Sequence, residues 1–224
     1  MGKGAIYDSL ERQVHQKIAE TIGERTPILD VACGEGRLTN FLAAKTKNEI
    51  YGTDISISNL TKAREAAEAQ GISHLVQYVE GDASKLHFLD ESFTAVVILY
   101  SLHEIENPRE ALKEIRRVLK AGCRLIVVDF VKGGGAEELW GERYFDLQEI
   151  ERMLQAAGFG EVATEFIYND IVFVSSRKVC TERIDKLEKA IMELKSRIPP
   201  HSVPPHMIEE LEDLEEELQG LKVV

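Results

Sequence analysis

Two glycines one residue apart, Gly34 and Gly36, follow a short apolar run that begins at Ile28. From Leu38 onward the apolar residues are spaced three and four positions apart, as in an amphipathic helix. The sequence therefore predicts a buried strand, a tight turn and a helix, in that order. Glycine suits such a turn because backbone without a Cβ atom can approach a ligand closely and adopt left-handed dihedral angles. In α/β proteins an adenine-containing cofactor binds at such a turn.

Acidic residues stand where the next two predicted strands end. Asp54 closes the second predicted strand, and its carboxylate could accept hydrogen bonds from both hydroxyls of a ribose or cap the following helix. Asp82 lies in the glycine-containing turn 80–84, where an aspartate is commonly a turn residue only. Together with Asp30 in the first strand, the three acids occur in the order expected for a nucleoside site.

The spacing of the glycines excludes two common nucleotide-binding motifs. In the dinucleotide pattern Gly-x-Gly-x-x-Gly, the three positions would be Ala32, Gly34 and Arg37. The bulky Arg37 argues against a pyrophosphate site, because the third glycine normally allows close helix–strand packing. No Gly-Lys-Ser/Thr follows the turn, so the P-loop pattern fails as well.

The segment from Asp30 to Gly36 reads Asp-Val-Ala-Cys-Gly-Glu-Gly and resembles motif I of the class I S-adenosylmethionine (SAM) methyltransferases. Ala32 stands in place of the first motif glycine, a variant that resembles the ubiquinone/menaquinone-biosynthesis branch. The run 101–130 is similar to small-molecule methyltransferases, and the resemblance extends over about residues 26–177. It implies SAM as cofactor and S-adenosylhomocysteine as product. The residues that it implies in cofactor binding are Asp30, Ala32, Gly34, Gly36, Asp54, Ile55, Asp82, Ala83 and Leu99.

The candidate catalytic residues follow the fourth predicted strand. His103 is the first candidate for a general base, because imidazole ionises near neutral pH, and Glu104 is the second. Either side chain could instead line the pocket or cap a helix, since methyl transfer depends mainly on positioning of the reactants. No metal site is expected, because the three cysteines are scattered and form no Cys-x-x-Cys pair.

Strands that alternate with helical patterns predict a parallel sheet covered by helices. Two further runs of alternating polarity, joined at residues 169–170, predict an antiparallel hairpin. The expected fold class is therefore α/β, a Rossmann-like seven-stranded sheet of five parallel strands plus an antiparallel closing hairpin. The predicted strands are 27–32, 49–54, 74–79, 94–100, 124–130, 161–168 and 171–176.

Segment 131–145 contains three consecutive glycines followed by Trp140, Tyr144 and Phe145. A glycine hinge with aromatic residues could form a lid over a substrate. The same residues could also form a surface loop that packs aromatic rings onto the core. The sequence leaves both interpretations open.

The last part of the chain lies outside the family resemblance. Apolar residues at heptad spacing in 184–198 and a second apolar stripe in 208–221 are separated by the proline-rich segment 199–205. We expect an α-helical hairpin over 179–224, appended to a methyltransferase domain at 1–178. Its two stripes predict a homodimer formed through this C-terminal hairpin, with docking on the chain's own domain as the alternative.

The composition narrows the range of partners. A formal net charge of −12 argues against nucleic acid, whose binding depends on lysine and arginine. The absence of a long apolar run and of a basic-apolar leader leads us to expect a cytoplasmic protein with no membrane partner. The expected function is methyl transfer from SAM to a small organic acceptor, at an atom that the sequence does not identify. The alternatives are a methyltransferase acting on a protein partner and a SAM-binding regulatory protein without turnover.

Overall fold

The computed structural model describes residues 3–179, 181–198 and 204–222. Its strands are β1 (Ile28–Val31), β2 (Ile50–Asp54), β3 (Val76–Glu80), β4 (Phe93–Leu99), β5 (Leu119–Phe130), β6 (Phe159–Tyr168) and β7 (Ile171–Lys178). Its helices are α1 (Lys3–Ile22), α2 (Arg37–Thr46), α3 (Ile57–Ala69), the 3₁₀ turn η1 (Ser73–Leu75), α4 (Pro108–Val118), α5 (Gly135–Trp140), α6 (Leu147–Ala156), α7 (Thr181–Arg197) and α8 (Pro205–Lys222).

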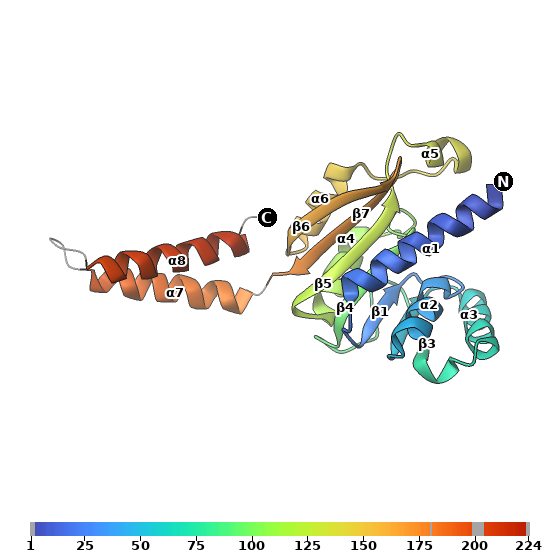
Figure 1. Cartoon of the computed structure of the whole chain (residues 1–224), viewed down its shortest axis with the longest axis horizontal. Coiled ribbons are helices and arrows are strands. Elements are labelled where there is room, and N and C mark those ends of the chain that lie inside the picture. Colours follow the sequence, from blue (N-terminus) through green and yellow to red (C-terminus); the bar gives the residue numbers. More distant parts are fainter. Residues whose placement is uncertain (1–2, 180, 199–203, 223–224) are drawn as a thin grey trace.

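In the described part of the chain the strands form one seven-stranded sheet in the order β3-β2-β1-β4-β5-β7-β6 (Figure 1). Strands β3, β2, β1, β4 and β5 are parallel, whereas β7 lies antiparallel between β5 and β6. This confirms the expected Rossmann-like α/β fold with a closing antiparallel hairpin. The strand order reverses between β1 and β4, and in such sheets the ligand crevice opens at that point, beyond the carboxyl ends of the strands.

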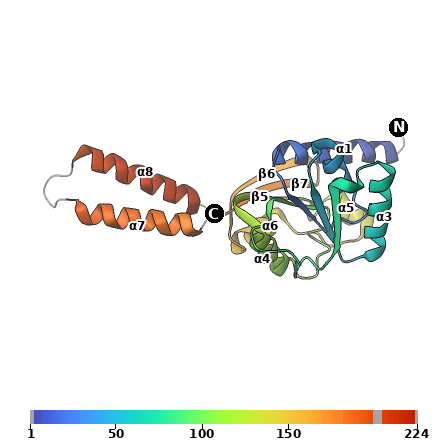
Figure 2. The same ribbon diagram turned by 90° about the horizontal axis from the view of Figure 1, so that it is seen from below.

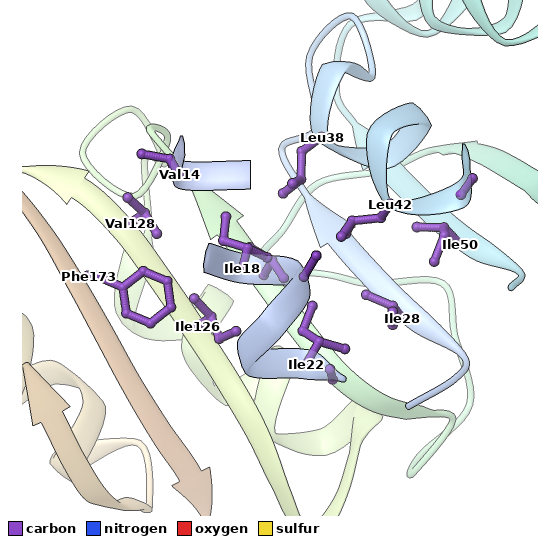
Figure 3. Close-up of a cluster of buried hydrophobic side chains, with 14 of the residues drawn as sticks. Val14, Ile18, Ile22, Ile28, Leu38, Leu42, Ile50, Ile126, Val128 and Phe173 are labelled. Atoms are coloured by element: carbon purple, nitrogen blue, oxygen red, sulfur yellow. The ribbon is translucent and has the colours of Figure 1, made fainter. Parts of the chain in front are cut away.

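Successive side chains of each strand point to opposite faces of the sheet, because the side chains of a strand repeat every two residues. One face carries Ile28, Ile50 and Ile126, which pack with the buried stripe of α1 and with Leu38 and Leu42 of α2 (Figure 3). The stripe of α1 consists of Val14, Ile18 and Ile22, all fully buried. Helix α1 therefore lies across this face as part of the core.

The opposite face carries the other half of each strand, including Leu29, Val96 and Leu125. These side chains pack against the apolar faces of α4 and α6, represented by Leu112 and Leu154. Because both faces of the central strands are covered, the sheet is rigid and can hold the loops at its carboxyl edge in fixed positions.

Segment 131–145 differs from a plain lid or loop because it contains the short helix α5. Asp170, in the turn between β6 and β7, accepts a hydrogen bond from the backbone N–H of Ala136 at 3.0 Å. A Cβ atom on Gly134 would lie 2.4 Å from the Cβ of Asp170, so glycine allows this close approach. At its far end the segment leads into α6, whose capping box joins Asp146 and Glu149.

Helices α7 and α8 pack side by side and project away from the sheet (Figures 1 and 2). The α7 side chains Leu187, Ile191 and Leu194 are buried, although the structure contains a single copy of the chain. The expected helical hairpin is present, but its partner helix covers much of the α7 stripe. This weakens the argument that a second chain is needed to cover it. Among the described helices, none combines the length and apolar character required to cross a bilayer.

Candidate functional site

The glycine loop connects β1 to α2 at the carboxyl edge of the sheet. Ala32, Gly34 and Gly36 all have positive φ angles, of 55°, 53° and 73°. At Gly36 a Cβ atom would lie 2.3 Å from the hydroxyl oxygen of Tyr78, so only glycine fits there. The loop thus turns sharply and presents its backbone toward the sheet edge, as the sequence predicts. The alanine at position 32 adopts a conformation that favours glycine, which is the residue of the related motif.

Asp54, at the end of β2, fixes this loop. One carboxylate oxygen accepts a hydrogen bond from the N–H of Gly34 at 2.8 Å, and the other accepts from the N–H of Ser56 at 2.8 Å. Each oxygen retains a second lone pair for a hydroxyl donor of a ligand. The carboxylate is therefore oriented before any ligand binds, which supports its predicted role toward a ribose.

The other predicted cofactor residues divide into two groups. Asp30, Ala32, Gly34 and Leu99 line one cavity of about 360 Å³ together with side chains of α1. Ile55, Asp82 and Ala83 lie beyond the ends of β2 and β3, which are joined by a hydrogen bond from Gly81 N–H to the Asp54 carbonyl. Gly36 begins α2 as its N-cap.

The second group combines an exposed apolar side chain with a carboxylate held in place. The Ile55 side chain is 74% exposed, whereas most isoleucines of the described chain are buried. An apolar side chain left in water beside a nucleoside site gains stability when a base covers it. Two hydrogen bonds from Ser84, from its N–H and its hydroxyl, lower the pKa of Asp82 and hold one carboxylate oxygen.

Asp30 is the most buried of the three acids, with 1% of its surface exposed. Burial raises its pKa to about 7, although the hydrogen bonds from Thr39 act in the opposite direction. The hydroxyl of Thr39 donates to the Asp30 carboxylate at 2.6 Å. The carboxylate thus connects β1 to α2 directly beneath the glycine loop.

His103 is held by a carboxylate that the sequence analysis did not select. Asp129, near the end of β5, accepts hydrogen bonds from the backbone N–H of His103 at 3.1 Å and bonds its Nδ1 at 2.8 Å. The Asp129 carboxylate is 1% exposed, and the imidazole side chain is 5% exposed. Desolvation alone would lower the pKa of His103, but the hydrogen bond and charge of Asp129, with smaller contributions from Glu104 and Glu142, raise it.

The second imidazole nitrogen lies beside Glu142. His103 Nε2 lies 3.2 Å from a carboxylate oxygen of Glu142, which also accepts a hydrogen bond from the Tyr144 hydroxyl at 2.8 Å. Ligand atoms of His103, Glu104 and Glu142 all lie within 4.8 Å of one another. The sequence predicted no metal here; the structure brings two carboxylates and one imidazole together, which are groups that can ligate a cation.

A chain of aromatic rings runs from the end of β4 to α5 and the segment after it. Tyr100 stacks on Phe130 with centroids 5.1 Å apart, and Phe130 contacts Trp140 and Tyr144 at 5.2 and 5.6 Å. Tyr144 lies against the His103 ring at 4.4 Å. Tyr100 has a φ angle of +53°, a strained conformation for a bulky residue that is typical of functional sites.

A larger cavity of about 730 Å³ begins at His103 and Glu104 and extends over the start of α4 toward α6. Leu99, Tyr100 and Ser101 line the smaller cavity, so residues 99–104 lie between the two. A methyl donor in the smaller cavity and an acceptor in the larger one would therefore meet at this segment.

The sequence analysis missed Asp129, Glu142 and the ring chain. Asp129 carried a signal, because a carboxylate within the apolar strand 125–130 must find a partner when buried. No feature of the sequence distinguished Glu142, because acidic residues are common in loops and its contact with His103 spans 39 positions.

Comparisons with known proteins agree with this architecture. Residues 29–127 match the family described as a methyltransferase domain. The chain is 38% identical over 109 residues to the ubiquinone/menaquinone biosynthesis C-methyltransferase UbiE of Ectopseudomonas mendocina, covering 48% of this chain and 43% of that protein. It is 36% identical over 109 residues to the chloroplastic 2-phytyl-1,4-beta-naphthoquinone methyltransferase of Arabidopsis thaliana, covering 47% and 42%. The chain spans less than half the length of these relatives.

Solved structures show the same fold. A SAM-dependent methyltransferase from Aquifex aeolicus matches with a TM-score of 0.64 and 22% identity, over 74% of this chain and 89% of that one. The [4+2]-cyclase SpnF matches with a TM-score of 0.67 and 23% identity, over 74% and 80%. One fold thus carries proteins described by two different activities, so the chemistry has to be argued from the side chains of the site.

Proposed function

From the premise that residues 29–127 form a SAM-dependent methyltransferase domain, we propose that the protein transfers the methyl group of SAM to a small organic acceptor, with His103 as general base. The observation that carries the proposal is the His103–Asp129 contact, on the segment 99–104 that contributes lining residues to both cavities. SAM supplies a methyl group on a sulfonium, which needs only an aligned nucleophile for transfer.

Residues of this chain fit both ends of the cofactor. The preoriented carboxylate of Asp54 would bind the ribose hydroxyls, and Asp82 with the Ala83 N–H would bind the adenine edge. Exposed Ile55 would pack against the base. Ala32 and Gly34 border the cavity of about 360 Å³, which would hold the methionine portion.

The role of His103 follows from its two nitrogens. Asp129 binds Nδ1, and in the neutral tautomer it accepts a hydrogen bond from Nδ1–H, which leaves a lone pair on Nε2, the nitrogen beside Glu142. The base would then take a proton from the acceptor at Nε2. Because Asp129 raises the pKa of His103, the imidazole is also a stronger base than a free one.

A small acceptor is supported by the shape and charge of the molecule. The cavity of about 730 Å³ is of the size that accommodates small ligands, and a net charge of −12 disfavours a nucleic acid. We assign catalysis to residues 1–178 and treat 179–224 as an appended hairpin whose self-association remains a prediction.

The test is transfer of a labelled methyl group. Full-length protein incubated with SAM carrying a deuterated methyl group and a set of small acceptors should form S-adenosylhomocysteine and a product heavier by that group. Mass spectrometry detects both. S-adenosylhomocysteine binding without any labelled product would support a SAM-binding protein without turnover.

A further inference from the structure

We propose that the methyl acceptor is an amine that enters the site as an ammonium ion and is recognised by the carboxylates around His103. The inference rests on the proposed function and specifies the substrate class of the same site. It follows from the charge, the spacing and the aromatic surroundings of one cluster, which we call the acidic cup: His103, Glu104, Asp129 and Glu142.

The acidic cup holds three carboxylates around one imidazole. Asp129 and Glu142 bind opposite nitrogens of His103, at 2.8 and 3.2 Å. Within the described ranges, no lysine or arginine forms an ion pair with any of the three acids. Even a protonated His103 would leave the cup with an excess of negative charge, so an additional cation is favoured there.

The ionisation of Glu104 is consistent with this excess. Partial burial raises its pKa, and the charges of Glu142, Asp129 and Asp54 raise it further, against the opposing effect of His103. The charge of His103 compensates this repulsion only in part, since the pKa of Glu104 stays raised. A cationic ligand would supply further positive charge and relieve the mutual repulsion of the acids.

The spacing of the cup suits an ammonium nitrogen. The ligand atoms of His103, Glu104 and Glu142 lie within 4.8 Å of one another. A nitrogen placed among three such atoms can approach each to about 2.8 Å, the usual length of a charge-assisted hydrogen bond. An alkylammonium ion has up to three N–H donors, which matches the two carboxylates and the Nε2 lone pair of a neutral His103.

The walls beside the cup also favour a cation. Tyr144 packs against His103 and belongs to the ring chain that continues through Phe130 to Trp140. Aromatic faces attract positively charged nitrogen through their quadrupoles, and they pack against the carbon skeleton of an amine. Of these rings, Tyr144 also lines the larger cavity.

The reaction balances with the groups present. The ammonium N–H bond breaks and its proton passes to His103 Nε2, which frees the nitrogen lone pair. The nitrogen then forms a bond to the methyl carbon while the carbon–sulfur bond breaks. The electron pair of that bond remains on sulfur, which gives the N-methylammonium product, S-adenosylhomocysteine and one proton, which His103 releases to water.

The experiment compares three probes that share a phenyl ring and differ in charge. Full-length protein saturated with S-adenosylhomocysteine, which lacks the sulfonium charge, is titrated calorimetrically with 2-phenylethylamine, 2-phenylethanol and 3-phenylpropanoate. We expect the amine to bind at least about tenfold more tightly than the alcohol, because charged hydrogen bonds are stronger than neutral ones. The carboxylate should bind most weakly.

Variants assign the preference to the cup. Glu104→Gln and Glu142→Gln should each reduce the preference for the amine, and the double variant should abolish it. Glu138→Gln is the matched control, since this exposed acid lies on the neighbouring α5 outside the cavity lining. It should retain the full preference.

Several results would overturn the inference. These are equal affinity for amine and alcohol, no measurable binding of the amine, or a preference that survives in the double variant. A preference that EDTA removes and Mg²⁺ or Mn²⁺ restores would assign the cup to a metal ion instead. If S-adenosylhomocysteine binds and methyl is transferred to hydroxyl acceptors only, this inference fails while the proposed function stands. If S-adenosylhomocysteine does not bind at all, the proposed function fails too.

Discussion

The cofactor half and the acceptor half of the site are built in different ways. In the cofactor half the Asp54 carboxylate binds backbone N–H groups, those of Gly34 and Ser56, which lie 20 and 2 positions away. In the acceptor half the side chains hold one another across long separations, as Asp129 and Glu142 hold His103 over 26 and 39 positions. The first half is therefore a property of the fold, and the second is a property of particular side chains.

This difference explains how one scaffold can serve many reactions. A carboxylate fixed by backbone N–H groups depends on the path of the backbone and little on the side chains of the neighbouring loops. A base that is oriented by other side chains changes when a loop changes. The solved structures described as a methyltransferase and as a cyclase share this fold, each at 22 or 23% identity to this chain, so the fold alone does not specify the reaction.

The largest expected effect is a loss of turnover without a loss of SAM affinity, in a variant of the acceptor half. His103→Ala should reduce turnover about 10²-fold or more, because the acceptor loses its base. The affinity for SAM should change little, since His103 lines the acceptor cavity. Calorimetry and single-turnover formation of S-adenosylhomocysteine measure the two effects. Unchanged turnover would assign His103 to the pocket wall.

The converse variant acts on the cofactor half. Asp54→Ala should weaken SAM binding by about 1–3 kcal/mol, equivalent to about 5- to 150-fold, because ribose hydroxyls and two backbone N–H groups lose their acceptor. Glu68→Ala, an exposed acid on α3, serves as control. An affinity equal to that of the parent would remove Asp54 from the site.

A third variant tests stability within the cofactor half. The folded pKa of Asp30, about 7, exceeds its ordinary value of 3.8, so the folded state binds the proton more tightly than the unfolded state. The free energy of unfolding should therefore fall as pH rises from about 4 to 7. Asp30→Asn carries no charge and should melt higher than the parent at pH 8 by about 2–4 °C for each kcal/mol gained.

The gain in melting temperature should be much smaller at pH 4, where the parent carboxyl is protonated in the folded state as well. Differential scanning calorimetry of both proteins at the two pH values makes this comparison. An equal difference at both values would show that Asp30 ionises normally in the folded protein.

A fourth variant, Asp129→Asn, tests the acceptor half through the pH dependence of turnover. Turnover should increase as His103 loses its proton, around a pKa above the ordinary 6.5. Asp129→Asn removes the neighbouring negative charge, so the rise should move to lower pH while turnover decreases. The pH dependence of kcat is the measurement, and a melting curve confirms that the variant folds. A profile that does not move would show that Asp129 has a structural role only.

The smallest effect is expected from the hairpin. Removing residues 179–224 should leave SAM affinity and turnover unchanged, because the hairpin lies outside both cavities. If the hairpin forms a dimer, light scattering should give about twice the chain mass for the full protein and a single chain for one ending at Lys178. Ile208→Glu, at an exposed position of α8, should dissociate the dimer, and Glu210→Gln should not. A full chain that is monomeric would contradict the prediction.

The fold could be predicted from the sequence, and the residues proposed for the cofactor half could be selected from it, because their signals are local. The glycine loop, the strand-end acids and the apolar periodicity each lie within short segments, and the strands are confirmed with shifts of a few residues at their ends. The longest shift is in β5, which begins at Leu119 where residue 124 was predicted, because Leu119 pairs with Phe93 ahead of a register shift.

The acceptor half could be predicted only in part. His103 was identifiable as a potential base, but its partner depends on the register of β4 and β5, which brings Asp129 beside residues that follow β4. The helix α5 was also not predicted, since its six residues are too few to give a periodic signal and begin with glycine. The partner of His103 and the position of α5 depend on contacts between distant parts of the chain, which cannot be predicted from the residues of one short segment.

The antiparallel direction of β7 has a consequence for how the molecule could be attached to something else. Because β7 runs opposite to β5, its last residues pair with Arg124, at the amino edge of the parallel strands. The hairpin α7–α8 therefore leaves the domain from the edge opposite the cavities (Figure 1). A surface, a bead or a fused enzyme coupled through that hairpin would leave the cofactor and acceptor openings facing outward. The chain thus has a built-in tether point at which immobilisation should not obstruct the exchange of SAM for its product.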